Sequence, residues 1–388
     1  MRTGTAAHPM NGYHFVKLNS TEILISDYVT AVEPTDVLDP KSLHPVLQGL
    51  FGEVGSIMSV AKKSVREGDA YPRFRRVAEE EFGDALWYLA ALCRRCDLRL
   101  DALFATAIDG NAYANQIVAS DSSLGAISQI AVPLQPGELD VALSALGKAT
   151  AALLDTPPSQ AAIELFAARY LDALHAAQLS FGAVLRHNVQ KARGAFIDPS
   201  PAELIDFDRN CAVEEQLPRE FKIRINQRAS GKSYLQWNGV FIGDPLTDNI
   251  GDPDGYRFHD VFHFAHAAIL HWSPVVRALI KHKRKSRPND DENQDGGRAI
   301  VVEEGLTAWL FSRAKELNYF EGQTKVSLGL LKTVQDFIAG YEVEECPLRL
   351  WEHAILRGYD VFRQVRDHQG GWVIGDRSAR TLRYEPLE

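Results

Sequence analysis

The sequence predicts a mainly helical protein, with an all-helical first half and a second half in which helices combine with a few strands. Apolar residues recur at helical spacing through most of the first half. Alternating segments typical of strands become frequent only after residue 219. At 388 residues the chain is also too long for one ordinary hydrophobic core. We therefore expect two domains.

The first half is predicted as an irregular lead-in followed by a helical module. Residues 1–40 form the lead-in, which includes the strand-like segment Thr21–Ile25. The module covers residues 41–197, and residues 120–137 within it are predicted as a loop because Ser, Gly and Pro recur there. Its predicted helices are 43–63, 74–96, 100–118, 138–154 and 159–193.

The second half is predicted as a helix-rich α+β domain over residues 220–388. Residues 198–219 carry prolines and mixed charge without periodicity, which indicates an interdomain linker. The predicted strands are 221–225, a hairpin over 234–242 around Asn238-Gly239, 372–374 and 381–384. The predicted helices are 256–283, 299–317, 326–341 and 348–367.

Composition narrows the function classes. The chain is 45% hydrophobic and 24% charged, and no apolar run approaches the roughly 20 residues that cross a bilayer. A net charge of −9 argues against nucleic acid or an anionic membrane as a partner. Four cysteines do not form a disulfide framework, and the first residues lack the apolar core of a signal peptide. A cytoplasmic protein is expected.

Two predicted helices carry carboxylates beside an apolar face. Glu53 lies on the first helix, and Glu81 and Asp84 lie one turn apart on the second. Gathered carboxylates repel one another and lose solvation, and a divalent metal offsets both costs. Mg²⁺ prefers such oxygen ligands. The alternative is three surface acids on amphipathic helices.

The surrounding residues strengthen the metal interpretation. Gly-Leu-Phe-Gly-Glu-Val-Gly (49–55) and Glu-Glu-Phe-Gly-Asp-Ala-Leu-Trp-Tyr-Leu-Ala (80–90) resemble the MazG-type nucleoside triphosphate pyrophosphohydrolases, all-α bundles with an E-x-x-E, spacer, E-x-x-D pattern. Glu53, Glu81 and Asp84 occupy matching positions. Ser56 stands where that family has its second glutamate, and Glu80 is a candidate replacement ligand.

A second segment is similar to the one that closes a MazG module. It runs from His187 to Phe196 and includes Asn188, Lys191 and Arg193. The resemblance implies that Lys191 meets phosphate as a point charge, while Asn188 and Arg193 orient phosphate or ribose. About a hundred residues separate this segment from the second acidic helix, so residues 101–180 are partly an insertion. Trp87 is a candidate to stack on a base, with core packing as the favoured alternative.

The resemblance implies a reaction. Such enzymes hydrolyse a nucleoside triphosphate to the monophosphate and pyrophosphate with Mg²⁺, for which Mn²⁺ can substitute. They are usually oligomers, and a homodimer is expected here. The alternative is a regulatory or defence protein that binds the triphosphate with little turnover, because of Ser56.

The second half contains another candidate site. His259, Asp260 and His263 lie on one predicted helix, with His266 on the same face as the other histidines, and Glu303 and Glu304 follow on a later helix. This group could bind a transition metal. The His259-Asp260 pair resembles that of HD-type metal phosphohydrolases, which leaves a phosphohydrolase or nuclease as a further alternative. Histidines packed within a helical core are the simpler reading. The whole second half also resembles a domain that accompanies some MazG modules.

Overall fold

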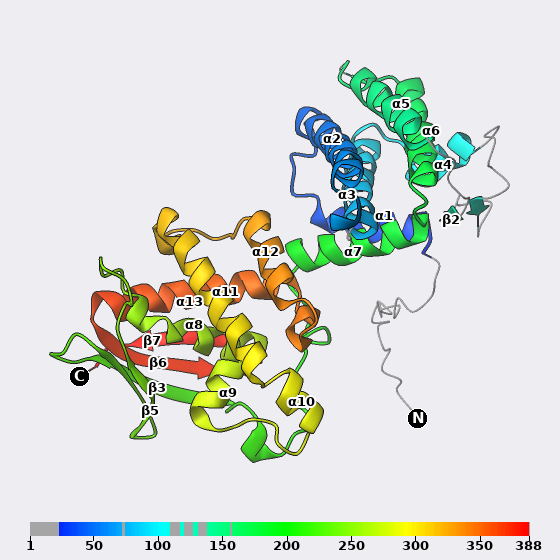
Figure 1. The fold of residues 1–388 in the computed structure, drawn as a ribbon. Coiled ribbons are helices and arrows are strands. Elements are labelled where there is room, and N and C mark those ends of the chain that lie inside the picture. The colour runs from blue at the N-terminus through cyan, green and yellow to red at the C-terminus, as the bar shows by residue number, and fades with distance from the viewer. Residues whose placement is uncertain are drawn as a thin grey trace, which may run out of the picture. The chain divides into compact units, whose positions relative to one another are not determined.

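Helices dominate both halves of the chain, and the predicted mainly α fold with a helix-rich α+β second half is confirmed (Figure 1). The computed structural model describes residues 23–71, 74–108, 117–119, 127–130, 138–155 and 157–387. The chain divides into two units, Met1–Arg193 and Gly194–Glu388. Each unit has its own hydrophobic core.

The first unit consists mainly of helices. Those described are α1 (Ile25–Val32), α2 (His44–Glu67), α3 (Phe74–Arg95), α4 (Leu100–Ile108), α5 (Glu138–Ala152), α6 (Gln160–Ala176) and α7 (Phe181–Phe196), the last crossing into the second unit. Short 3₁₀ turns cover Glu33–Thr35 and Gly68–Ala70. Two short strands, β1 (Ile117–Ala119) and β2 (Ile127–Ile130), pair antiparallel.

The antiparallel pair α2–α3 forms the centre of this unit. Helix α2 has a proline in its first turn and ends at Glu67, because Gly68 follows with a positive φ of 52°. Its apolar residues face the core. The two helices approach closely where the Tyr88 ring packs over Gly49, because a Cβ at Gly49 would lie only 2.1 Å from that ring.

The first unit differs from prediction at several boundaries. The lead-in contains α1, whose first residue is Ile25, so that residue begins a helix rather than ending a strand. Of the predicted helix 100–118, Leu100–Ile108 is helical as α4 and residues 117–119 form β1, whereas residues 109–116 lie outside the described residues. The predicted loop 120–137 lies outside the described residues except for β2. The predicted helix 159–193 is two helices, α6 and α7.

A five-stranded antiparallel sheet with the order β5-β4-β3-β6-β7 lies in the second unit. The strands are β3 (Glu220–Gln227), β4 (Ser233–Trp237), β5 (Val240–Leu246), β6 (Gly370–Asp376) and β7 (Thr381–Glu385). Burial alternates along β3, where Phe221, Ile223 and Ile225 are buried. Helices α8 (Asp260–Ala265) and α13 (Leu348–Asp367) pack against the sheet. The predicted strands and the hairpin turn at Asn238-Gly239 are confirmed.

The predicted helix 256–283 is broken into four pieces. A 3₁₀ turn (Tyr256–Phe258) precedes α8, a π-helical turn follows (His266–Leu270), and α9 covers Pro274–Ile280. His271 has a positive φ of 59° and ends the π turn. Ser273 then caps α9, because its hydroxyl accepts a hydrogen bond from the Val276 amide at 3.0 Å. The remaining helices are α10 (Pro288–Asn293), α11 (Gly297–Glu316) and α12 (Leu328–Ile338).

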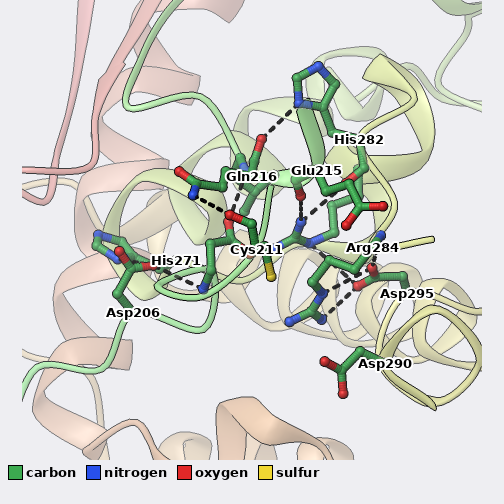
Figure 2. A network of polar contacts seen from close by, with 12 residues as sticks. Asp206, Cys211, Glu215, Gln216, His271, His282, Arg284, Asp290 and Asp295 are labelled. Atoms are coloured by element: carbon green, nitrogen blue, oxygen red, sulfur yellow. Dashed lines mark hydrogen bonds and ion pairs between the residues drawn. The ribbon is translucent and has the colours of Figure 1, made fainter. Parts of the chain in front are cut away.

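The predicted linker 198–219 lies within the second unit and is held there by charge. Asp208 pairs with the buried Arg277 and accepts a hydrogen bond from the Leu217 amide at 2.8 Å. Asp206 pairs with Arg377 at 2.6 Å. Figure 2 shows Asp206 beside His271, and Arg284 directed at Asp295. Ion pairs to the buried arginines Arg277 and Arg377 therefore fix a segment that has no periodic pattern.

Candidate functional site

The three acidic residues singled out in the first unit lie together. Glu53 comes from α2, and Glu81 and Asp84 come from successive turns of α3. Each residue offers one carboxylate oxygen, and these oxygens lie within 4.8 Å of one another. All three residues are partly buried. The α2–α3 contact thus brings together carboxylates that are about 30 residues apart in the sequence.

The cluster carries more negative charge than its surroundings neutralise. The pKa of Glu53 is raised from 4.5 to about 7, first because burial disfavours the charged form, and then because Asp84 and Glu81 repel it. The positive charge of Lys191 lowers the pKa of Glu53 but does not cancel these effects. A carboxylate that protonates near neutral pH marks a position where a cation is favoured.

Lys191 on α7 faces the same cluster. Its ammonium group pairs with Asp84 and lies 2.8 Å from Oε1 of Glu80. Burial alone would lower the pKa of Lys191, but the carboxylates of Asp84 and Glu80 raise it above its ordinary value. The lysine therefore stays charged beside the acidic group.

Asn188 lies one turn before Lys191 and bridges two helices. Its Nδ2 donates to Oδ1 of Asp84 at 3.3 Å, and its Oδ1 accepts a hydrogen bond from the Tyr28 hydroxyl at 2.7 Å. The hydroxyl donor fixes which end of the amide points at Asp84. Gly83 allows this approach, because a Cβ there would lie 2.9 Å from Cβ of Asn188. Tyr28 was not predicted, since nothing near it in the sequence indicates a partner 160 residues away.

The other predicted residues of this site fall in different places. Glu80 pairs with Lys191 and does not belong to the group of three oxygens. Trp87 packs against the core and donates its indole N–H to Thr35 at 2.7 Å. Arg193 forms no ion pair with the carboxylates among the described residues. Ser56 is half-buried on α2, one turn after Glu53.

The second predicted group is also brought together, around Glu303 of α11. The carboxylate of Glu303 is fully buried, and Nδ1 of His263 and Nδ1 of His266 lie 3.0 and 2.9 Å from its Oε1. The Ser273 hydroxyl lies 2.9 and 3.0 Å from the two oxygens, and the Val275 amide donates to Oε2 at 3.0 Å. The π turn between α8 and α9 brings these donors to one carboxylate. Ser273 and Val275 carry no sequence signal of this role.

Glu304 is the next residue of α11, and its carboxylate lies near the Nε2 atoms of the His259 and His263 rings. Its Oε2 lies 3.5 Å from Nε2 of His259 and 3.4 Å from Nε2 of His263. Burial would lower the pKa of His263, but Glu303 and Glu304 together raise it to about 10. Asp260 is buried, and burial raises the pKa of its carboxyl group. This arrangement also favours positive charge.

Comparison with known proteins gives a family match within the second unit. Residues 202–388 match the family model described as the MazG C-terminal domain, which supports a MazG-related protein. No curated protein and no solved structure gave a significant match to the chain. Among the described residues, none of the helices has both the length and the apolar character needed to span a membrane.

Proposed function

We propose, from the MazG relationship of residues 202–388 and the acidic cluster of the first unit, that this chain hydrolyses a nucleoside triphosphate to the monophosphate and pyrophosphate with Mg²⁺. The observation that carries the proposal is the set of three carboxylate oxygens within 4.8 Å of one another on two packed helices. Among the described residues, this is the only potential metal-binding group that consists entirely of carboxylates.

The residues present fit a hard divalent cation. Mg²⁺ prefers oxygen ligands and keeps part of its water shell, which Glu53, Glu81 and Asp84 can accommodate at a partly exposed position. The raised pKa of Glu53 supports this fit, because one lysine leaves the three carboxylates incompletely neutralised. When bound, the ion would polarise the phosphate and lower the pKa of a water molecule. Mn²⁺ is expected to substitute.

The side chains of this site have distinct roles in the proposed reaction. Water attacks the α-phosphorus, the bond from that phosphorus to its bridging oxygen breaks, and pyrophosphate leaves. Glu53 has a pKa of about 7 in the metal-free protein, so binding of the ion would release its proton and leave a charged ligand. Lys191 uses two of its three N–H bonds on Asp84 and Glu80, so the third can meet a phosphate oxygen. Asn188, held by Tyr28, keeps Asp84 oriented.

The test is pyrophosphate release from each common NTP and dNTP by the purified full-length protein, with and without Mg²⁺. Glu81→Gln should reduce the rate at least 100-fold, since it removes one charged ligand while preserving the shape of the side chain. Glu67→Gln, at the far end of α2, is the matched control and should retain the wild-type rate. Equal rates in the wild type and Glu81→Gln would contradict the proposal.

Ser56 favours a second candidate function, a nucleotide-binding protein with weak turnover. It lies one turn from Glu53 on α2, where MazG-type enzymes have a glutamate, and a hydroxyl is a poorer Mg²⁺ ligand than a carboxylate. Ser56→Glu separates the two functions. A large gain in rate with tighter Mg²⁺ binding supports a nucleotide-binding protein whose turnover is limited by Ser56. An unchanged rate supports an active enzyme with a three-carboxylate site.

The expected homodimer stays a prediction. Light scattering coupled to size-exclusion chromatography measures the molar mass in solution, and a value near the 43.1 kDa of one chain would contradict the prediction.

A further inference from the structure

Two histidines of the second unit present a ring nitrogen to the same carboxylate oxygen. Their hydrogen bonds leave this nitrogen available on each ring. Nδ1 of His259 lies 2.9 Å from the carbonyl oxygen of Tyr256, which can only accept, so Nδ1 carries the proton. Nδ1 of His263 donates in the same way to Glu303 at 3.0 Å. When a ring is neutral its lone pair lies on Nε2, so a metal ion that binds there would displace the proton that this nitrogen otherwise holds.

The distances around Glu304 exceed those of strong hydrogen bonds and match the spacing of ligands on a metal ion. Oε2 of Glu304 lies 3.5 Å from Nε2 of His259 and 3.4 Å from Nε2 of His263. Strong hydrogen bonds to a carboxylate are about 2.8 Å long. Two ligand atoms that each bind a tetrahedral ion at about 2.1 Å lie roughly 3.4 Å apart. Both nitrogen–oxygen distances match this separation.

Unused polar atoms point to the same position. Nε2 of His263 is buried and has no hydrogen-bond partner, although its side chain is completely inaccessible to solvent. Asp260 is buried and forms no hydrogen bond or ion pair within the described part of the chain. Its carboxylate offers an oxygen within 4.8 Å of a ring nitrogen from each of the two histidines.

Charge in this region favours a cation, which in the metal-free protein is the imidazolium of His263. Asp260, Glu303 and Glu304 bring three carboxyl groups close together, and none of the ion pairs in the described residues joins them to lysine or arginine. Most buried nitrogens in folded proteins have a hydrogen-bond partner, so an unpaired one among carboxyl groups requires an explanation. A metal ion would use that nitrogen and balance the carboxylates.

We propose that His259, His263 and Glu304 bind a first-row divalent transition metal, with Zn²⁺ as the expected ion. Two imidazoles and one glutamate form a ligand set used by catalytic zinc sites, which keep a further position for water or substrate. Glu303 is a positioning residue, because it holds the His263 ring by Nδ1 and directs Nε2 toward the ion. The side chain of Glu304 is 40% exposed, so the site is reached from solvent.

The experiment measures zinc on the full-length protein, purified without a metal-binding tag, stripped with chelator and titrated with Zn²⁺ by calorimetry. The wild type should bind about one tight equivalent. Glu304→Gln should weaken this binding at least 100-fold with an unchanged circular dichroism spectrum, since Glu304 is partly exposed. Glu316→Gln, an exposed glutamate later on α11, is the matched control and should bind like the wild type.

Two further variants separate this site from the acidic cluster and test the positioning role. Glu53→Gln should leave the tight zinc equivalent intact, because it lies in the other unit. Glu303→Gln should weaken zinc binding by 10- to 100-fold without removing it, the effect expected when an outer hydrogen bond to a ligand is lost. A wild type without a tight equivalent, or Glu304→Gln with wild-type affinity, would overturn the proposal.

Discussion

Replacing Glu53 by glutamine should stabilise the metal-free protein while abolishing its proposed activity. Glu53 has a pKa of about 7 in the folded chain and 4.5 as a free side chain. Below pH 4.5 it is protonated in both the folded and unfolded states, so it has no effect on stability. Between these values the unfolded chain loses its proton first, and the free energy of unfolding falls as pH rises. Above pH 7 the destabilisation is complete.

The size of the effect follows from the pKa. At about 1.4 kcal/mol for each tenfold change in proton affinity, a pKa of about 7 in place of 4.5 corresponds to roughly 3 kcal/mol. Glu53 is only half-buried, and solvent screening reduces this to about 1–2 kcal/mol. Glu53→Gln removes the cost. The first unit should then melt a few degrees higher at pH 8.

Thermal unfolding in chelator at several pH values between 5 and 8 measures this difference. The gap between Glu53→Gln and the wild type should widen as pH rises, and Mg²⁺ should narrow it by stabilising only the wild type. Glu67→Gln is the control, because it removes a carboxylate from the same helix away from the cluster. A gap that is independent of pH, or one that is largest at pH 5, would refute the reasoning.

Three other substitutions give distinct outcomes. Lys191→Met leaves Asp84 without its cation, so the free energy of unfolding, measured with denaturant at pH 8, should fall by about 1–3 kcal/mol. The variant should also lose most of the pyrophosphate release, and unchanged activity would contradict the role given to the lysine. Gly83→Ala places a Cβ 2.9 Å from Cβ of Asn188, so crowding should outweigh the gain in helix propensity and lower the melting temperature. A higher melting temperature would show that α3 and α7 can move apart at little cost. Arg277→Leu removes the main ion-pair partner of the buried Asp208 and should cost about 3–5 kcal/mol, measured as a shift of the second unit's unfolding transition to a lower denaturant concentration. A change below about 1 kcal/mol would contradict the importance of this pair.

Local patterns explain what the sequence could reveal. Helical periodicity defined α2 and α3, and the one-turn spacing of Glu81 and Asp84 put both on one face. The pairing of two neighbouring helices then sufficed to bring Glu53 to them. The strands around Asn238-Gly239 were predicted for the same reason, since the turn and the alternation lie in one short segment.

Long-range pairing explains what the sequence could not reveal. Tyr28 reaches Asn188 through tertiary packing alone, and nothing in α1 marks it as part of a site. The break between α8 and α9 falls in a fully buried apolar run, Ala267–Leu270, where periodicity cannot distinguish an α turn from a π turn. Glu303 and Glu304 are adjacent in the sequence, yet they face opposite sides of the His263 ring.

The ion pairs of Asp206 and Asp208 determine where the chain can be truncated without removing the counterions of buried arginines. A fragment that begins at the first strand, residue 220, would retain Arg277 and Arg377 in the interior and discard the carboxylates that neutralise them. A fragment that begins near residue 198 would keep both counterions. Truncation of the chain for expression or crystallisation should therefore preserve this aperiodic segment, because its two aspartates neutralise buried arginines of the second unit.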